Sequence, residues 1–316
     1  MPDNSNNNER LKLITEIEKQ TNSNLICLVY NTTPTRFRTQ LASDLLSPLN
    51  SLLKSIPKSF KKENVFLLLH STGGTLDVIT SFVYLVRMHF KLFNVVIPEI
   101  AHSAATILSL GADKIYMSYY SSLSPFDPQV TIRTQAGNIA ASLEAIEGYY
   151  SIMKDMFNDD TAKIQAFNLL ANRFPPEVLG EVERVKQQVK MIASKMLKYQ
   201  EFKDDRIESI VNRFQKEFFS HNYRIHFDEA KDLGLNVYLM NEELENLSLQ
   251  LLSLYTQSFG GKSDLEIEIP EGENYSEIIL NRSYLECQYS SFSYKTKYRV
   301  LKEKRVELEE LGWLQN

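Results

Sequence analysis

Cysteine is scarce in this chain: only Cys27 and Cys287 occur among its 316 residues. Two thiols cannot form the disulfide framework of a small secreted protein, and most cysteine-based metal sites are excluded as well. Walker, Rossmann and zinc-ligand spacings are also absent, so we expect no metal and no cofactor. Such low cysteine usage is typical of a reducing compartment and predicts a cytoplasmic protein.

The chain also lacks a run of about 20 apolar residues, which is the length that a bilayer-spanning helix needs. Its longest apolar stretch, residues 94–112, contains Glu99 and His102 and is interpreted as buried core. The first ten residues are polar and lack the apolar centre of a signal peptide. The sequence therefore predicts no membrane span.

Neither sign of charge dominates the composition. The 35 basic and 40 acidic side chains leave a formal net charge of −5. A mildly acidic chain attracts a nucleic-acid backbone poorly, so we expect no nucleic-acid partner. Hydrophobic residues make up 43% of the chain, which is enough for a large core. The length is compatible with two domains or with one α/β domain and an extension.

Between residues 24 and 117, short apolar runs of strand length alternate with segments of helical spacing. The runs are 24–30, 65–69, 95–97 and 114–117, and helical spacing covers 44–56, 76–90 and 103–110. Continuous apolar strands are typical of parallel sheets that are buried on both faces, and parallel strands need crossover helices. The alternation thus predicts an α/β fold with a mostly parallel sheet.

The later parts of the chain have a different pattern. Residues 139–219 show mostly helical spacing, with a break at Pro175 and Pro176, whereas segments after Gly260 alternate apolar and polar residues as strands do. We therefore expect three parts: a flexible N-terminus with a short helix over residues 1–23, an α/β domain over 24–257, and a small β-rich extension over 258–316.

Two turns between a buried strand and a helix are candidates for a site, because α/β sheets bind ligands at the carboxyl ends of their strands. In the first turn, Gly73 and Gly74 allow a ligand to approach the backbone closely. In the second, Ser103 begins a helix whose dipole favours negative charge. The alternatives are an ordinary tight turn for the glycines and a helix cap for the serine.

Together, the two turns would supply a nucleophile and an oxyanion hole. Ser103 would provide the attacking hydroxyl. The N–H groups of Ala104 and of Gly73 or Gly74 would stabilise the negative charge that develops on the carbonyl oxygen.

Five blocks of sequence carry a more specific signal. They read His-Ser-Thr-Gly-Gly (70–74), Ala-His-Ser-Ala-Ala-Thr (101–106), Gly-Ala-Asp-Lys-Ile-Tyr-Met (111–117), Leu-Ser-Pro-Phe-Asp-Pro-Gln (123–129) and Ser-His-Asn-Tyr-Arg-Ile-His-Phe-Asp-Glu-Ala-Lys-Asp-Leu-Gly-Leu (220–235). In this order they resemble the serine dehydrogenase proteinase family, which has the Clp-peptidase/crotonase fold and is related to signal peptide peptidase A. The likeness covers residues 24–257 and implies the ββα-superhelix of that fold.

By this resemblance, Ser103 takes the nucleophile position, and Gly73, Gly74 and Ala104 take the oxyanion hole. Relatives form rings or stacked oligomers, so a homo-oligomer is also implied. The chain departs from the family pattern at several positions: Thr72 stands for proline, Ala105 for glycine, Lys114 for an acidic residue, Ser124 for glycine and Asn222 for aspartate.

A serine hydroxyl needs a general base to attack at neutral pH. Clp peptidases use histidine, and the resemblance places His221 near the site; Asp127 could orient it, or could instead form a turn between its two prolines. Signal peptide peptidase A uses lysine, which must be desolvated so that its pKa falls from about 10.4. Lys154, on an apolar helical segment, is the better lysine candidate and Lys186 the weaker. The sequence leaves this choice open.

The sequence thus predicts a serine peptidase, ATP-independent or partner-regulated, that cleaves polypeptides through an acyl-enzyme at Ser103. One alternative is a catalytically impaired pseudo-peptidase that binds peptides or assembles partners, which Lys114 and Asn222 favour. The other is a crotonase-type enzyme, in which the same two loops polarise the carbonyl of an acyl thioester.

Overall fold

The computed structural model describes residues 4–33, 39–126, 129–134, 137–156, 159–174, 176–218, 220, 222–259, 269, 273–301 and 306–316. Its centre is an eight-stranded sheet in the order β12-β11-β10-β1-β2-β3-β5-β9. The parallel strands are β1 (Asn24–Tyr30), β2 (Asn64–His70), β3 (Leu92–Ile97), β5 (Lys114–Met117) and β9 (Val237–Leu239). The first four contain the four predicted apolar runs, and the predicted mostly parallel α/β fold is confirmed.

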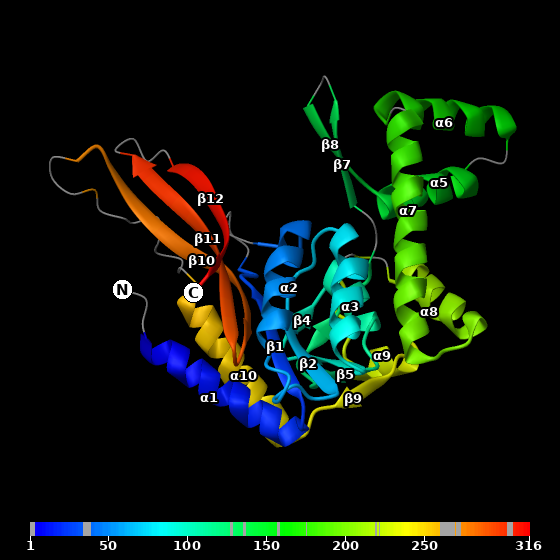
Figure 1. Cartoon of the computed structure of the whole chain (residues 1–316). Coiled ribbons are helices and arrows are strands. Elements are labelled where there is room, and N and C mark those ends of the chain that lie inside the picture. Colours follow the sequence, from blue (N-terminus) through cyan, green and yellow to red (C-terminus); the bar gives the residue numbers. More distant parts are fainter. Residues whose placement is uncertain are drawn as a thin grey trace.

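Strand β1 shows how the sheet is covered, because its side chains alternate between two apolar clusters. Leu25, Cys27 and Val29 belong to the cluster of α1 (Asn4–Thr21) and α10 (Glu242–Ser258). Ile26, Leu28 and Tyr30 belong to the cluster of α2 (Leu46–Ser55), α3 (Asp77–His89) and α4 (Ala104–Leu110). Figure 1 shows α1 and α10 together on one side of the sheet. All of β1 is buried, as the unbroken apolar run predicts.

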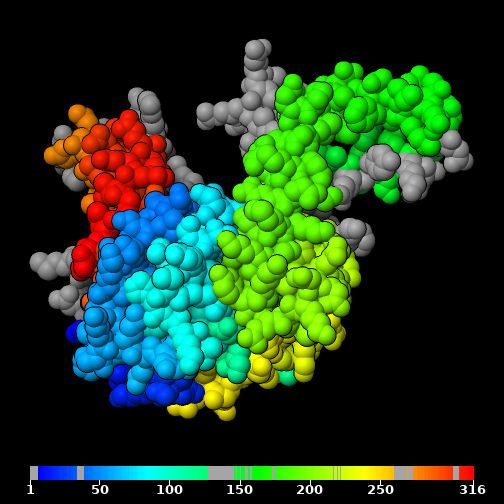
Figure 2. Space-filling model, turned by 45° about the vertical axis from the view of Figure 1, so that its right-hand side comes forward, coloured from blue at the N-terminus to red at the C-terminus, as the bar shows by residue number. Residues whose placement is uncertain are grey.

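The C-terminal strands extend this sheet, because β10 (Tyr275–Cys287) pairs antiparallel with β1. Strands β11 (Ser290–Leu301) and β12 (Val306–Gln315) follow in antiparallel order. They form the β-rich region that the alternation after Gly260 predicts. The outer part of β10–β12, which we call the β-arm, rises from the body in Figures 1 and 2.

A second arm is helical and consists of α5 (Leu143–Met156), α6 (Asp160–Arg173) and the first half of α7 (Pro176–Leu197) (Figures 1 and 2). The second half of α7 joins the main core. Helical spacing predicts a helix from residue 139, but β7 (Gln129–Thr134) and β8 (Gly137–Ser142) form a hairpin before it. Gly137 and Asn138 have low helix propensity, and the helix begins only at Leu143.

Short elements complete the fold. They are η1 (Ser43–Leu45), β4 (Ile100–Ala101), β6 (Ser122–Leu123), η2 (Lys198–Gln200), α8 (Asp204–Lys216) and α9 (Phe227–Asp232). Helix α1 begins at Asn4, so it occupies most of the N-terminal segment that the sequence predicts to be flexible with a short helix. Among the described residues, no helix combines the length and the apolar character that a membrane crossing requires.

Candidate functional site

The two predicted turns lie side by side. The first follows β2 and the second follows β4, and backbone hydrogen bonds join them. The Ser71 N–H donates to the Ile100 carbonyl at 3.1 Å, and the His102 N–H donates to the Ser71 carbonyl at 3.0 Å. Strand β4 ends at Ala101, two residues before Ser103, and Ala101 pairs with Ser71. This pairing places Ser103 beside the glycine turn.

The glycine turn needs its glycines for close contact. Gly73 has a φ of +104°, and a Cβ atom there would lie 2.9 Å from the Cβ of Ser103 and 2.7 Å from the His102 carbonyl oxygen. A Cβ on Gly74 would overlap the Leu41 carbonyl. The glycines therefore do more than form an ordinary tight turn, because they allow the backbone of residues 73–74 to lie directly against the backbone at Ser103.

Ser103 has a strained backbone. Its φ of +51° and ψ of −119° lie outside the regions that L-residues prefer, which costs about 1–3 kcal/mol. Ser103 stands at the N-cap position of α4, yet its side chain makes no capping hydrogen bond. The helix-cap alternative is therefore wrong. Within the described residues, the Ser103 hydroxyl has no hydrogen-bond partner and remains available for another role.

Three backbone N–H groups of the two turns, those of Gly73, Gly74 and Ala104, are candidate oxyanion donors. The Gly73 N–H already donates to the Ser71 hydroxyl oxygen at 3.0 Å. The N–H groups of Gly74 and Ala104 donate to no other residue that the structure describes. Leu41 bonds the carbonyl of Gly73 and the N–H of Thr75, so the intervening Gly74 N–H points away from Leu41.

A hydroxyl network holds the strained amide of Ser103. The Ser103 N–H donates to the Ser124 hydroxyl oxygen at 2.7 Å, and that hydroxyl donates to the Pro125 carbonyl at 2.9 Å. The Thr106 hydroxyl lies 2.7 Å from the Ala101 carbonyl and accepts from the Ser124 N–H at 3.1 Å. Ser124 replaces the glycine of the family pattern, and glycine offers no such acceptor. The sequence shows the departure at Ser124 but does not show that its partner is the Ser103 amide.

His70 and His102 adjoin the turns but contact other groups. The His70 Nε2 atom lies 3.0 Å from the Thr32 hydroxyl, and the His102 Nε2 atom lies 3.0 Å from the Ser122 hydroxyl. Burial, helped by the nearby His102, lowers the pKa of His70 to about 3. His70 is therefore neutral at pH 7, and its 3.7 Å contact with Glu99 is not an ion pair there.

The buried, neutral state of His70 predicts a pH-dependent stability. Unfolding returns its pKa from about 3 to about 6.5, so the stabilisation is complete above pH 6.5 and is lost as pH falls toward 3. The expected slope is up to about 1.4 kcal/mol per pH unit. As the pH is lowered from 6.5 to 4, the free energy of unfolding measured in urea should therefore fall more steeply for the wild type than for His70→Gln. The half-buried His89→Gln serves as the control; parallel pH profiles for wild type and His70→Gln would contradict the prediction.

Most of the candidate bases lie outside the residues that the structure describes. His221 and Asp127 lie outside the described residues, as does the side chain of Lys154, whose backbone belongs to α5 in the helical arm. Lys186 lies on α7, the helix that packs against α4. The chain flanking His221 does reach the site, because the N–H and carbonyl groups of Ile225 and Leu123 exchange two hydrogen bonds of 2.9 Å.

Comparison with known proteins gives one family and several distant relatives. The profile of ClpP-like SDH-type serine proteinases matches residues 3–277. Two uncharacterized proteins of Methanocaldococcus jannaschii are similar in sequence. One is 23% identical over 272 residues, covering 85% of this chain and 84% of its own length; the other is 25% identical over 259 residues, covering 81% and 82%.

Two solved structures are similar in outline. A mutant of the 1510-N membrane-bound stomatin-specific protease covers 67% of this chain and 79% of its own, with 13% identity and a TM-score of 0.42. ClpP1 from Listeria monocytogenes covers 73% of this chain and 98% of its own, with 12% identity and a TM-score of 0.37.

Proposed function

The chain belongs to the ClpP-like SDH-type serine proteinase family, and we propose that its nucleophile is Ser103. The family match over residues 3–277 confirms the resemblance that the five sequence blocks indicate, and it identifies the chain as a serine peptidase. One observation carries the assignment of the nucleophile. Ser103 has a strained backbone and a hydroxyl without a partner among the described residues, directly beside the glycine turn.

In the proposed reaction, the Ser103 hydroxyl oxygen attacks a peptide carbonyl while a base takes its proton. The N–H groups of Ala104 and of Gly74 or Gly73 would stabilise the oxyanion. An oxyanion at Gly73 would share its N–H with the Ser71 hydroxyl, whereas Gly74 offers an unshared donor. The amine product leaves with the proton, and water then hydrolyses the acyl-enzyme.

We propose polypeptides as the substrates. Gly73 and Thr75 are hydrogen-bonded to Leu41 on one side, which leaves the N–H of Gly74 facing the other side. An extended peptide pairs with such a free backbone edge by strand addition. This would bring its carbonyl past Ser103.

Two residue types compete for the role of base. His221 is supported by the two hydrogen bonds between Ile225 and Leu123, which lies one residue before Ser124. Lys154 could act as the base only if the helical arm reached Ser103. Lys186 could do so only if the middle of α7 reached Ser103. We propose His221 as base with Asp127 as its partner, and Lys154 as the alternative.

Labelling with a fluorophosphonate probe tests the proposal. The probe phosphonylates an activated serine, and peptide mapping of the wild-type protein should find the label on Ser103. A label on another serine, or no label, would overturn the assignment. Labelling without hydrolysis of any unfolded protein would instead favour the pseudo-peptidase. Lys114, one of its two supporting departures, is exposed and lies over the Tyr238 ring at 4.9 Å.

We further propose a cytoplasmic homo-oligomer. Helices α5 and α6 of the helical arm carry large apolar side chains that are more than half exposed: Ile152, Met156, Ile164, Phe167 and Leu169. Apolar surface of this kind is typical of protein–protein contact. Cys27 and Cys287 are buried free thiols, which supports a reducing compartment.

Ser124 is expected to act as a positioning residue for Ser103. Ser124→Ala removes the acceptor of the Ser103 N–H, and the loss of about 1.4 kcal/mol with such a hydrogen bond corresponds to about a tenfold change in rate. We expect kcat for peptide hydrolysis to fall about tenfold while KM changes little. Ser109→Ala is the matched control, because Ser109 is a buried serine whose hydroxyl donates to Ala105 within α4. Equal kcat values for Ser124→Ala and Ser109→Ala would contradict the proposed positioning role of Ser124.

A further inference from the structure

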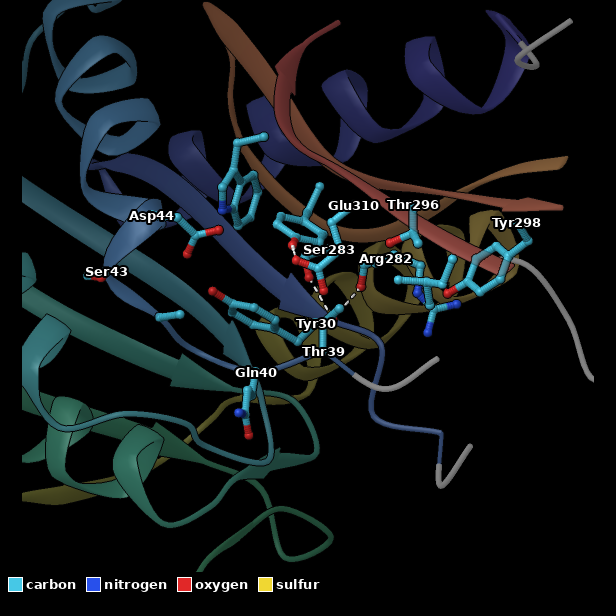
Figure 3. A pocket seen from close by; sticks show the side chains of 14 residues that line it. Tyr30, Thr39, Gln40, Ser43, Asp44, Arg282, Ser283, Thr296, Tyr298 and Glu310 are labelled. Carbon is cyan, nitrogen blue, oxygen red and sulfur yellow. Dashed lines mark hydrogen bonds between the residues drawn. The ribbon is translucent and has the colours of Figure 1, made fainter. Parts of the chain in front are cut away.

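A cavity of about 520 Å³ lies at the root of the β-arm, apart from Ser103. The end of β1, residues 39–44 and the inner faces of β10–β12 line it, as Figure 3 shows. Tyr30, Tyr294 and Trp313 contribute aromatic rings, and Asp44 and Glu310 contribute carboxylates. The cavity is therefore both aromatic and acidic at one end.

The aromatic rings and carboxylates form an ordered group. The Trp313 ring packs edge-on against Tyr30 at 6.4 Å and against Tyr294 at 5.7 Å. The Tyr294 hydroxyl donates to Glu310 at 2.9 Å. A neutral donor thus orients the Glu310 carboxylate. Burial and, to a smaller extent, the nearby Glu310 raise the pKa of Asp44.

A buried hydroxyl marks the inner wall of the cavity. Tyr30 is only 2% exposed, and its hydroxyl has no hydrogen-bond partner within the described residues. In Figure 3 this hydroxyl points toward the side of the cavity that holds Asp44. A buried polar group normally has a partner, so a ligand atom at this position would satisfy Tyr30.

We propose that this cavity binds the cationic group of a basic amino acid, either free or within a peptide. An ammonium or guanidinium group would neutralise Asp44 and Glu310 and would lie against the Trp313 and Tyr294 rings as a cation–π contact. Figure 3 places Arg282 beside Thr296 and Tyr298, away from Asp44. The positive charge at that end orients the ligand with its cationic group toward the carboxylates.

The cavity is connected to the candidate active site by one segment. Gln40 and Ala42 line the cavity. Leu41 between them accepts from the Thr75 N–H at 2.9 Å and donates to the Gly73 carbonyl at 2.8 Å. A ligand that orders residues 40–42 would therefore also order the glycine turn. Binding itself does not depend on Ser103 being a nucleophile.

Trp313 makes the test direct, because it is the only tryptophan in the chain. Titration of the full-length protein with Nα-acetyl-lysine amide should change its tryptophan emission in a saturable manner. Nα-acetyl-norleucine amide has the same stem without the charge and should bind at least about tenfold more weakly. Asp44→Asn and Glu310→Gln should each weaken lysine-amide binding by about tenfold as well.

Glu309→Gln is the matched control, since Glu309 neighbours Glu310 on β12 but pairs with Lys297 instead. It should bind like the wild type. Isothermal titration calorimetry checks each variant without relying on Trp313, and circular dichroism checks that each is folded. Equal binding of the lysine and norleucine amides, or wild-type binding by both Asp44→Asn and Glu310→Gln, would overturn the proposal. Free lysine and a peptide with an internal lysine, compared in the same assay, distinguish the two sources of the cation.

Discussion

Replacing Ser103 by alanine is expected to lower the kcat for hydrolysis of an unfolded protein by about 10⁴-fold or more. No other described serine combines a strained backbone at the end of the β4 pairing with an unengaged hydroxyl. Without that hydroxyl no acyl-enzyme forms, and only binding and oxyanion donors remain to assist the attack of water. The measurement is fluorogenic-peptide hydrolysis together with fluorophosphonate labelling, with Ser109→Ala as the control.

A second substitution separates catalysis from folding at the same position. Ser103→Gly also lacks the hydroxyl, but glycine adopts a φ of +51° with little strain. It should therefore be inactive and yet more stable than Ser103→Ala by about 1 kcal/mol in urea unfolding. A Ser103→Ala protein that retains wild-type hydrolysis would refute Ser103 as the nucleophile. An inactive Ser103→Ala protein that is also unfolded would leave the test to Ser103→Gly.

Local patterns made the core of the fold predictable. Strand β1 has the predicted bounds, 24–30, because a continuous apolar run between polar residues specifies a buried strand. The meeting of the two turns was predictable as well, since neighbouring parallel strands present their carboxyl ends at one edge. The helical spacing of residues 103–110 predicted helix α4, which has Ser103 at its N-cap position.

Contacts between distant residues could not be predicted in this way. A sequence shows Ser124 as a departure from glycine, but only the fold brings its hydroxyl to the Ser103 amide, 21 residues earlier. Alternation after Gly260 indicates strands without indicating which edge they join, and the pairing of β10 with β1 decides that. His221 and Asp127 lie outside the described residues, so their roles remain predictions.

The attachment of the C-terminal strands is expected to depend on one buried ion pair, Arg10 with Glu286. The Glu286 side chain is fully buried and the Arg10 side chain is 7% exposed, with their Nε and Oε2 atoms 2.9 Å apart. The Tyr255 hydroxyl donates to the same carboxylate oxygen at 2.6 Å. Arg10 belongs to α1, Tyr255 to α10 and Glu286 to β10, so this cluster joins three elements from the two ends of the chain.

Glu286→Ala should destabilise the protein by about 3–5 kcal/mol, because it leaves the Arg10 charge buried without a counterion. Urea unfolding followed by circular dichroism and by the emission of Trp313, on β12, measures both the loss and its location. Exposed Glu277→Gln, which breaks the surface pair with Arg299, is the control and should change stability little. An unchanged midpoint for Glu286→Ala would contradict the prediction.

Removing the whole cluster distinguishes a charge effect from a packing effect. The combination Arg10→Met, Glu286→Leu and Tyr255→Phe leaves no charge and no hydroxyl in this cluster, and apolar replacements of buried ion pairs are often neutral or stabilising. This variant should therefore be more stable than Glu286→Ala alone. If it is equally unstable, the cluster stabilises by shape rather than by charge. If only the Trp313 transition moves in Glu286→Ala, the C-terminal strands detach before the core unfolds, since the cluster is a buried polar link between β10 and α1.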